Sequence, residues 1–129
     1  MTTEKLAAIA AVDEKADLVA YVANQVWEYA ELSLQEEKSA AMYCEVLERE
    51  GFAVEKGICN ISTAFSASYG SGRPLIGFLA EYDALSGMSQ TAGSLEREER
   101  GAGGCGHGCG HNLLGAGAFA AALAVKAYL

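Results

Sequence analysis

The sequence predicts an α/β domain, and three observations indicate it. Residues 4 to 30 contain neither glycine nor proline and repeat apolar side chains at helical spacing. Residues 75 to 80 are almost continuously apolar, which is typical of a central strand buried on both faces. An apolar, alanine-rich segment follows at residues 113 to 129. Helices before strands, and a helix after a central strand, favour helices layered on a sheet.

Two helices are expected before the first strand. Residues 4 to 30 predict one continuous helix, whose buried face would comprise Val19, Val22, Val26 and Tyr29. Ser33 followed by Glu36 matches a capping box, so a second helix should begin there. Its apolar stripe would comprise Ala40, Tyr43, Val46 and Leu47. Gly51 is expected to end this helix as its C′ glycine.

Short strands are expected at residues 52 to 55 and 63 to 69, with Asn60 in the turn between them. A turn at residues 70 to 72 should lead into the central strand. The stretch from residue 84 to 111 has no strong periodicity, and so long an irregular segment is usually functional or disordered. The charged residues 96 to 100 within it are interpreted as a solvated surface. Asn112 is expected to cap the final helix.

Composition excludes several classes of protein. The 129 residues form one domain or a piece of one, with a net charge of −8 that would repel a phosphate backbone, so no nucleic-acid partner is expected. The N-terminus lacks a basic region, and no uninterrupted apolar stretch is long enough to span a bilayer. Four cysteines in such a chain are expected to be thiols or metal ligands, in a cytoplasmic protein.

The segment Gly-His-Gly-Cys-Gly-His-Asn at residues 106 to 112 concentrates metal-ligating side chains. Cys109 and His111 are two residues apart, so an extended backbone would direct both toward one ion, and thiolate with imidazole suits zinc or a comparable metal. The alternative is that this cysteine and this histidine are incidental loop residues without a metal. A second alternative is a closed structural site that adds Cys105 and His107. His107 could otherwise face the substrate, support the site or simply be solvated.

Asp83 would end the central strand, where α/β sheets place their functional crevice. Its carboxylate could bind a metal or orient a ligand, although a turn aspartate is an equal alternative. Glu81 would lie on the same side of a straight strand and is a further candidate. The glycines 101, 103 and 106 formally match a dinucleotide-binding pattern, but no strand precedes them directly. We interpret that match as accidental; an oxidoreductase would require detectable NAD binding.

Two blocks resemble a known family. They are residues 79 to 85, Leu-Ala-Glu-Tyr-Asp-Ala-Leu, and residues 106 to 115, Gly-His-Gly-Cys-Gly-His-Asn-Leu-Leu-Gly. Together they are similar to the metal-dependent amidohydrolases of the aminoacylase and carboxypeptidase superfamily, and residues 31 to 37 resemble a segment near the start of that family. The resemblance implies that residues 1–129 are the N-terminal part of a three-layer αβα metallopeptidase-like catalytic domain.

The resemblance also implies functional roles. Cys109 and His111 would be ligands of a one- or two-metal centre that holds manganese or zinc. Asp83 would orient that centre without binding the ion, and Glu81 stands where related peptidases have a histidine ligand. Cys105 matches no ligand of the family. Family members hydrolyse an amide bond, here expected to join an acyl or aroyl group to an amino acid, so the partner would be a small-molecule N-acyl amino acid.

In the family, the chain continues well beyond this point into a glutamate pair, a dimerisation domain and a late histidine ligand, whereas this sequence ends at Leu129. The chain is therefore expected to be an incomplete and inactive portion of a longer, oligomeric enzyme. The alternative is a small non-catalytic metal-binding or interaction module, in which Cys105, His107, Cys109 and His111 close a structural site.

Overall fold

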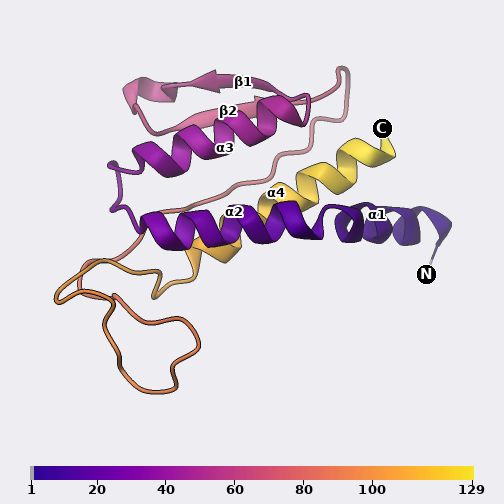
Figure 1. Cartoon of the computed structure of the whole chain (residues 1–129). Coiled ribbons are helices and arrows are strands. Elements are labelled where there is room, and N and C mark those ends of the chain that lie inside the picture. Colours follow the sequence, from indigo (N-terminus) through magenta and orange to yellow (C-terminus); the bar gives the residue numbers. More distant parts are fainter. Residues whose placement is uncertain (1) are drawn as a thin grey trace.

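The computed structural model of this chain describes residues 2 to 129 and contains both helices and strands (Figure 1). The elements, in chain order, are α1 (Thr3–Glu14), α2 (Ala16–Tyr29), α3 (Glu37–Arg49), β1 (Ala53–Lys56), the 3-10 turn η1 (Ile58–Asn60), β2 (Phe65–Ser68) and α4 (His111–Tyr128). The predicted mixture of helix and strand is confirmed. Within residues 2–129 the sheet has only two strands, β1 and β2.

The prediction of one helix over residues 4 to 30 is wrong, because the helix breaks at Lys15. The backbone there has φ −103° and ψ 9°, and the Lys15 N–H bonds to the Val12 carbonyl, three residues back instead of four. The Lys15 ammonium meets the Glu50 carboxylate at 2.7 Å. Of the two helices, only α2 contributes buried side chains to the core, because α1 has no buried residue. The two helices still lie nearly in line in Figure 1.

Helix α3 has the predicted apolar stripe and the predicted end, but not the predicted cap. Ser33 is exposed and four residues before the helix. The carboxylate of Glu31 accepts the N–H groups of Lys38 and Ser39 and the Ser39 hydroxyl, each at 2.9 Å. These N–H groups lack partners within the helix, so a carboxylate there replaces the capping box. Gly51 ends the segment with φ +84°, as expected.

Strands β1 and β2 form an antiparallel hairpin in which Val54 lies opposite Ala67. Both strands were predicted, and Asn60 lies in the connection with a positive φ of 61°. The hairpin packs on α3 and closes one side of the core. Helices α2, α3 and α4 supply most of the buried side chains, which include Val22, Val26, Tyr43, Val46, Phe119 and Leu123.

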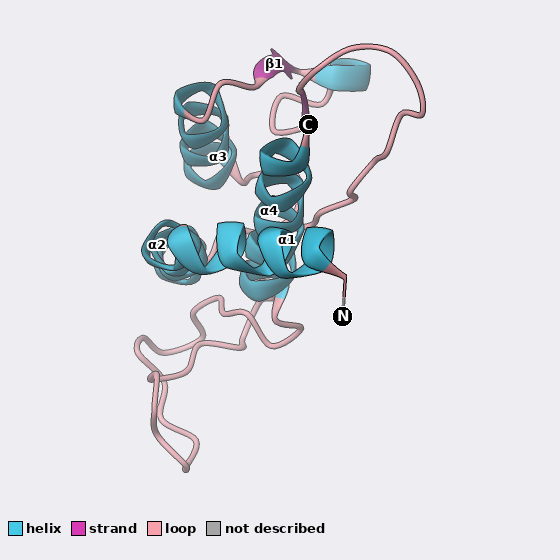
Figure 2. Cartoon of the chain, turned by 90° about the vertical axis from the view of Figure 1, so that its right-hand side faces the viewer, coloured by secondary structure: helices cyan, strands magenta, loops and turns pink. Residues whose placement is uncertain are grey.

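The predicted central strand at residues 75 to 80 is wrong. These residues form no strand, and the side chains of Leu75 and Leu79 are 84% and 88% exposed. A strand can be buried on both faces only if other strands and helices cover it, and in residues 2–129 the hairpin pairs only with itself. The segment therefore runs as an extended connection from the hairpin to the start of α4 (Figures 1 and 2).

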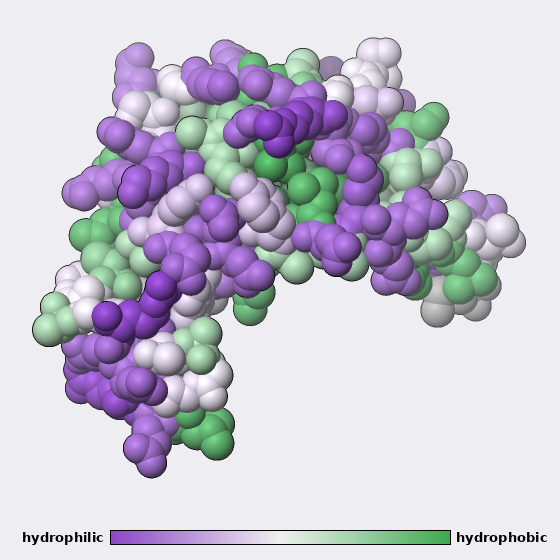
Figure 3. Space-filling model, in the orientation of Figure 1, coloured by the Kyte–Doolittle hydropathy of each residue, from purple (hydrophilic) through white to green (hydrophobic). Residues whose placement is uncertain are grey.

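Residues 86 to 105 form a long loop that projects from the body at the end opposite the hairpin (Figure 2). Backbone hydrogen bonds pin it at its base: Leu85 and Gly106 exchange two, of 2.9 and 3.0 Å, and the Ser89 N–H donates to the Gly104 carbonyl at 3.1 Å. Residues 96 to 100 are exposed, which confirms the predicted solvated surface. Figure 3 shows the loop as a mainly hydrophilic arm beside a hollow. None of the helices within residues 2–129 could cross a membrane.

Candidate metal centre

Three metal-ligating side chains meet where the extended connection reaches the start of α4. Glu81 and Asp83 come from the connection, and His111 is the first residue of the helix. Each offers one ligand atom, and the three atoms lie within 4.8 Å of one another. Glu81 is exposed, whereas Asp83 and His111 are partly buried. Two carboxylates and an imidazole form a donor set that suits zinc or manganese.

The imidazole of His111 lies between the two carboxylates. Its Nδ1 is 2.8 Å from Asp83 Oδ1, and its Nε2 is 3.3 Å from Glu81 Oε2. A carboxylate accepts hydrogen bonds, so the Asp83 contact places the proton of a neutral ring on Nδ1. The lone pair on Nε2 then faces another acceptor, Glu81. A divalent cation between Nε2 and Glu81 would satisfy both groups, so these residues fit a metal ion.

Backbone contacts fix the segment that carries Asp83. The Ala84 N–H donates to the Glu31 carbonyl at 2.7 Å, and the adjacent Leu85 pairs with Gly106. A Cβ on Gly106 would overlap the Met88 carbonyl, so this approach requires glycine. The two segments of the centre, 28 residues apart, are therefore held together by main chain. The sequence did not predict that the Glu31 carbonyl would hold the segment that carries Asp83, because no local motif indicates this contact.

The expectation of an extended backbone between Cys109 and His111 is wrong. The Gly110 N–H donates to the His107 carbonyl at 3.0 Å, which makes residues 107 to 110 a turn, and Gly110 adopts φ +72° before α4 begins. Asn112 does not cap the helix: it is buried in the first turn, and its side-chain amide donates to the Ala23 carbonyl at 3.4 Å. Cys109 is exposed and lies outside the three-residue group.

His107 is neither solvated nor part of the group of ligands. It is 6% exposed, its Nε2 is 2.8 Å from the Val26 carbonyl oxygen, and its ring stacks on Trp27 with centroids 6.2 Å apart. Burial lowers the pKa of His107, although the Val26 carbonyl and Asp83 oppose that shift. Its Nδ1 is buried with no hydrogen-bond partner.

The structure does not gather the four residues of the alternative structural site. All four cysteines are free, and Cys105 lines a separate polar pocket of about 250 Å³ beside Trp27 and Arg100. The one group of three or more potential ligands within residues 2–129 is Glu81, Asp83 and His111. The geometry therefore favours a centre built from the connection and α4.

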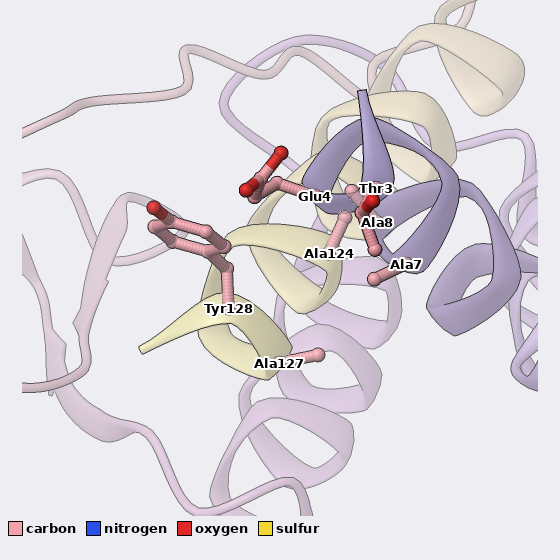
Figure 4. Close-up of a pocket in the computed structure, with 7 residues that line it drawn as sticks. All are labelled: Thr3, Glu4, Ala7, Ala8, Ala124, Ala127 and Tyr128. Atoms are coloured by element: carbon pink, nitrogen blue, oxygen red, sulfur yellow. The ribbon is translucent and has the colours of Figure 1, made fainter. Parts of the chain in front are cut away.

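A further cavity, of about 260 Å³, lies far along α4 from this centre, between that helix and α1 (Figure 4). Its lining consists of Thr3, Glu4, Ala7, Ala8, Ala124, Ala127 and Tyr128. Small alanine side chains leave this space between the helices, and Glu4 is its sole carboxylate. It offers no convergent set of ligands comparable to the centre at His111.

The candidate centre combines carboxylates and an imidazole, which are ligand types that hydrolytic metal centres use. Comparison with curated proteins identifies relatives with hydrolase names. The chain is 49% identical over 108 residues to a subunit of p-aminobenzoyl-glutamate hydrolase from Escherichia coli (strain K12). It is 30% identical over 138 aligned residues to the Xaa-Arg dipeptidase of Homo sapiens. These similarities confirm that the chain resembles part of a hydrolase and, more weakly, part of a dipeptidase.

The similarity extends over most of this chain but over a small part of each relative. The first alignment covers 84% of the chain and 22% of the bacterial protein. The second covers 97% of the chain and 28% of the human protein. No protein-family model matches the chain, and no solved structure does.

Proposed function

We propose that this chain supplies part of a divalent-metal centre that hydrolyses the amide bond of an N-acyl or N-aroyl amino acid resembling p-aminobenzoyl-glutamate. The observation that carries the proposal is the placement of His111 between Asp83 and Glu81, at 2.8 and 3.3 Å. The name of the bacterial relative supports the substrate class. The metal would be manganese or zinc.

Each residue of the centre has a proposed role. Asp83 holds the His111 ring through Nδ1, which fixes its orientation and keeps Nε2 unprotonated for metal binding. Cys109, exposed on the preceding turn, would add a thiolate ligand. Glu81 is exposed enough to bind the ion or to accept a proton at its carboxylate. A bound divalent ion would polarise the substrate carbonyl and lower the pKa of a water molecule.

The proposed setting is the N-terminal part of a three-layer αβα metallopeptidase-like catalytic domain. The exposed apolar side chains of residues 75 to 80 support this setting, because they have the composition of a covered strand. The bacterial relative is named as one subunit of its hydrolase, which supports an oligomeric enzyme. A cytoplasmic location and the absence of a nucleic-acid or membrane partner remain predictions.

Metal binding is tested by titrating the chain with cobalt(II), whose absorption reports ligand type. We expect stoichiometric uptake with one thiolate, and its loss in the double variant Cys109→Ala, His111→Ala. Cys59→Ala is the matched control, because Cys59 is also an exposed thiol but lies on η1. Unchanged uptake by the double variant would refute the proposed ligands. A two-thiolate spectrum that is lost in Cys105→Ala would support the structural-site alternative instead.

Hydrolysis is tested separately, because the chain matches less than a third of either relative. A protein of the relatives' length that contains this sequence is assayed for release of p-aminobenzoate from p-aminobenzoyl-glutamate. We expect His111→Ala to abolish release and Cys59→Ala to leave it unchanged. Full activity of the His111→Ala protein would overturn the proposed function.

A further inference from the structure

His107 connects the turn that carries Cys109 to the end of α2. Its Nε2 lies 2.8 Å from the carbonyl oxygen of Val26, in the last turn of that helix. The ring also stacks on the neighbouring Trp27, with centroids 6.2 Å apart and planes inclined by 30°. Both contacts are 80 or more residues distant in sequence, so they join parts of the chain that would otherwise be independent.

The hydrogen bond defines which ring nitrogen carries the proton. A carbonyl oxygen can only accept, so Nε2 of His107 donates. Nδ1 of a neutral ring is then an acceptor, and it is buried without a partner in hydrogen-bond geometry, although the main chain of Asp83 lies close enough to raise the pKa of His107. Leaving a buried polar atom unsatisfied is unfavourable, and an apolar side chain of similar size would avoid that cost. Packing alone therefore does not explain histidine at this position.

A second polar contact anchors the start of α4, directly after this turn. The amide of Asn112 donates to the carbonyl of Ala23, one helical turn before Val26. Cys109 and His111 lie between these two anchors in the sequence. Both anchors attach to α2, so the backbone between them has little freedom to move relative to that helix.

We propose that His107 is a positioning residue, which holds the turn of residues 107 to 110 on α2 and thereby fixes Cys109 and His111 relative to Asp83. The inference rests on the proposed metal centre. Residues behind metal ligands typically alter metal affinity 10- to 100-fold when they are removed, because the ligands must then be ordered on binding. His107 would position the ligands through the backbone of the turn, without touching the ion.

The test compares cobalt(II) affinity and absorption spectra, alongside thermal unfolding, in variants of the 129-residue chain. His107→Leu fills the space but cannot donate, and we expect at least a tenfold loss of affinity with an altered spectrum. His107→Gln offers an amide donor for the Val26 carbonyl. It should recover most of the cobalt affinity and most of the original absorption spectrum. Val46→Ala, a buried change in α3, is the control for general destabilisation and should leave the spectrum unchanged.

Each outcome distinguishes this inference from the proposed function. Absence of cobalt binding by the unsubstituted chain would overturn the metal centre itself. Binding by the unsubstituted chain, with equal affinity and spectrum in His107→Leu, would overturn only the positioning role. An equal loss in Val46→Ala would also overturn it, since any destabilisation would then suffice. If His107→Leu fails to fold, Asn112→Ala removes the second anchor and should weaken binding in the same way.

Discussion

Alanine at Gly115 should destabilise the chain, whereas alanine at Gly117, two residues further along α4, should stabilise it. A methyl group on Gly115 would overlap the Tyr43 hydroxyl and lie 3.0 Å from the Glu81 carbonyl oxygen. A methyl group on Gly117 would meet nothing within 4 Å. Both glycines are inside the same helix, so the pair separates the effect of crowding from that of helix propensity.

The expected magnitudes follow from these contacts. Replacing a helical glycine by alanine stabilises a protein by about 0.5–1 kcal/mol, and this gain is common to both variants. Overpacking costs about 1–3 kcal/mol, and it applies only at Gly115. The free energies of unfolding of the two variants should therefore differ by about 1–3 kcal/mol, with Gly117→Ala the more stable.

The assay is urea unfolding, followed by circular dichroism and by the fluorescence of Trp27. Adding Tyr43→Phe to Gly115→Ala removes the overlapping hydroxyl and should recover part of the loss. Tyr43→Phe alone should cost little, because that hydroxyl has no hydrogen-bond partner. Equal stabilities of Gly115→Ala and Gly117→Ala would refute the close packing of α4 against Tyr43 and the Glu81 backbone.

The remaining predictions concern a helix cap, an orienting carboxylate and a buried tyrosine. Glu31→Ala should lower the free energy of unfolding by about 0.5–2 kcal/mol, because it removes the acceptor at the start of α3. Ser33→Ala should change it by less than about 0.5 kcal/mol in the same urea experiment; an equal loss would contradict the cap. Asp83→Asn should weaken cobalt binding about 10- to 100-fold in equilibrium dialysis, while the exposed Asp13→Asn should not. Burial raises the pKa of Tyr43 above its usual 10.0, so above pH 10 the unfolded chain loses a proton that the folded chain keeps. That tyrosine should therefore reduce stability by about 1.4 kcal/mol per pH unit in urea unfolding. Tyr43→Phe should remove this contribution and leave that of Tyr82, whose pKa burial also raises.

Features with a local cause could be predicted from the sequence. The apolar stripe of α3 and the glycine that ends it depend on residues three or four apart, and the hairpin depends on alternation and a turn. The break at Lys15 could not be predicted, because no glycine or proline marks it and the Glu50 carboxylate that Lys15 meets there is 35 residues away in the sequence. The Glu31 cap also acts from outside any recognised motif.

The residues of the candidate centre could be nominated from the sequence, but not their geometry. Motifs singled out Glu81, Asp83 and His111, and the structure brings these three together. The direction of Cys109 depended on an assumed extended backbone, which the positive φ of Gly110 excludes. The burial of His107 depends on Trp27, which is 80 residues away and whose position only the tertiary fold defines.

The exposed connection at residues 75 to 80 has a consequence for the behaviour of the chain at high concentration. Leu-Ile-Gly-Phe-Leu-Ala is uncharged, rich in strand-forming side chains and free of proline, the composition of segments that assemble into intermolecular sheets. Its backbone groups are uncovered in residues 2–129, so separate molecules are expected to pair along it. Leu79→Lys places a charge on a side chain that is already 88% exposed, so it should suppress aggregation in light scattering without lowering the melting temperature.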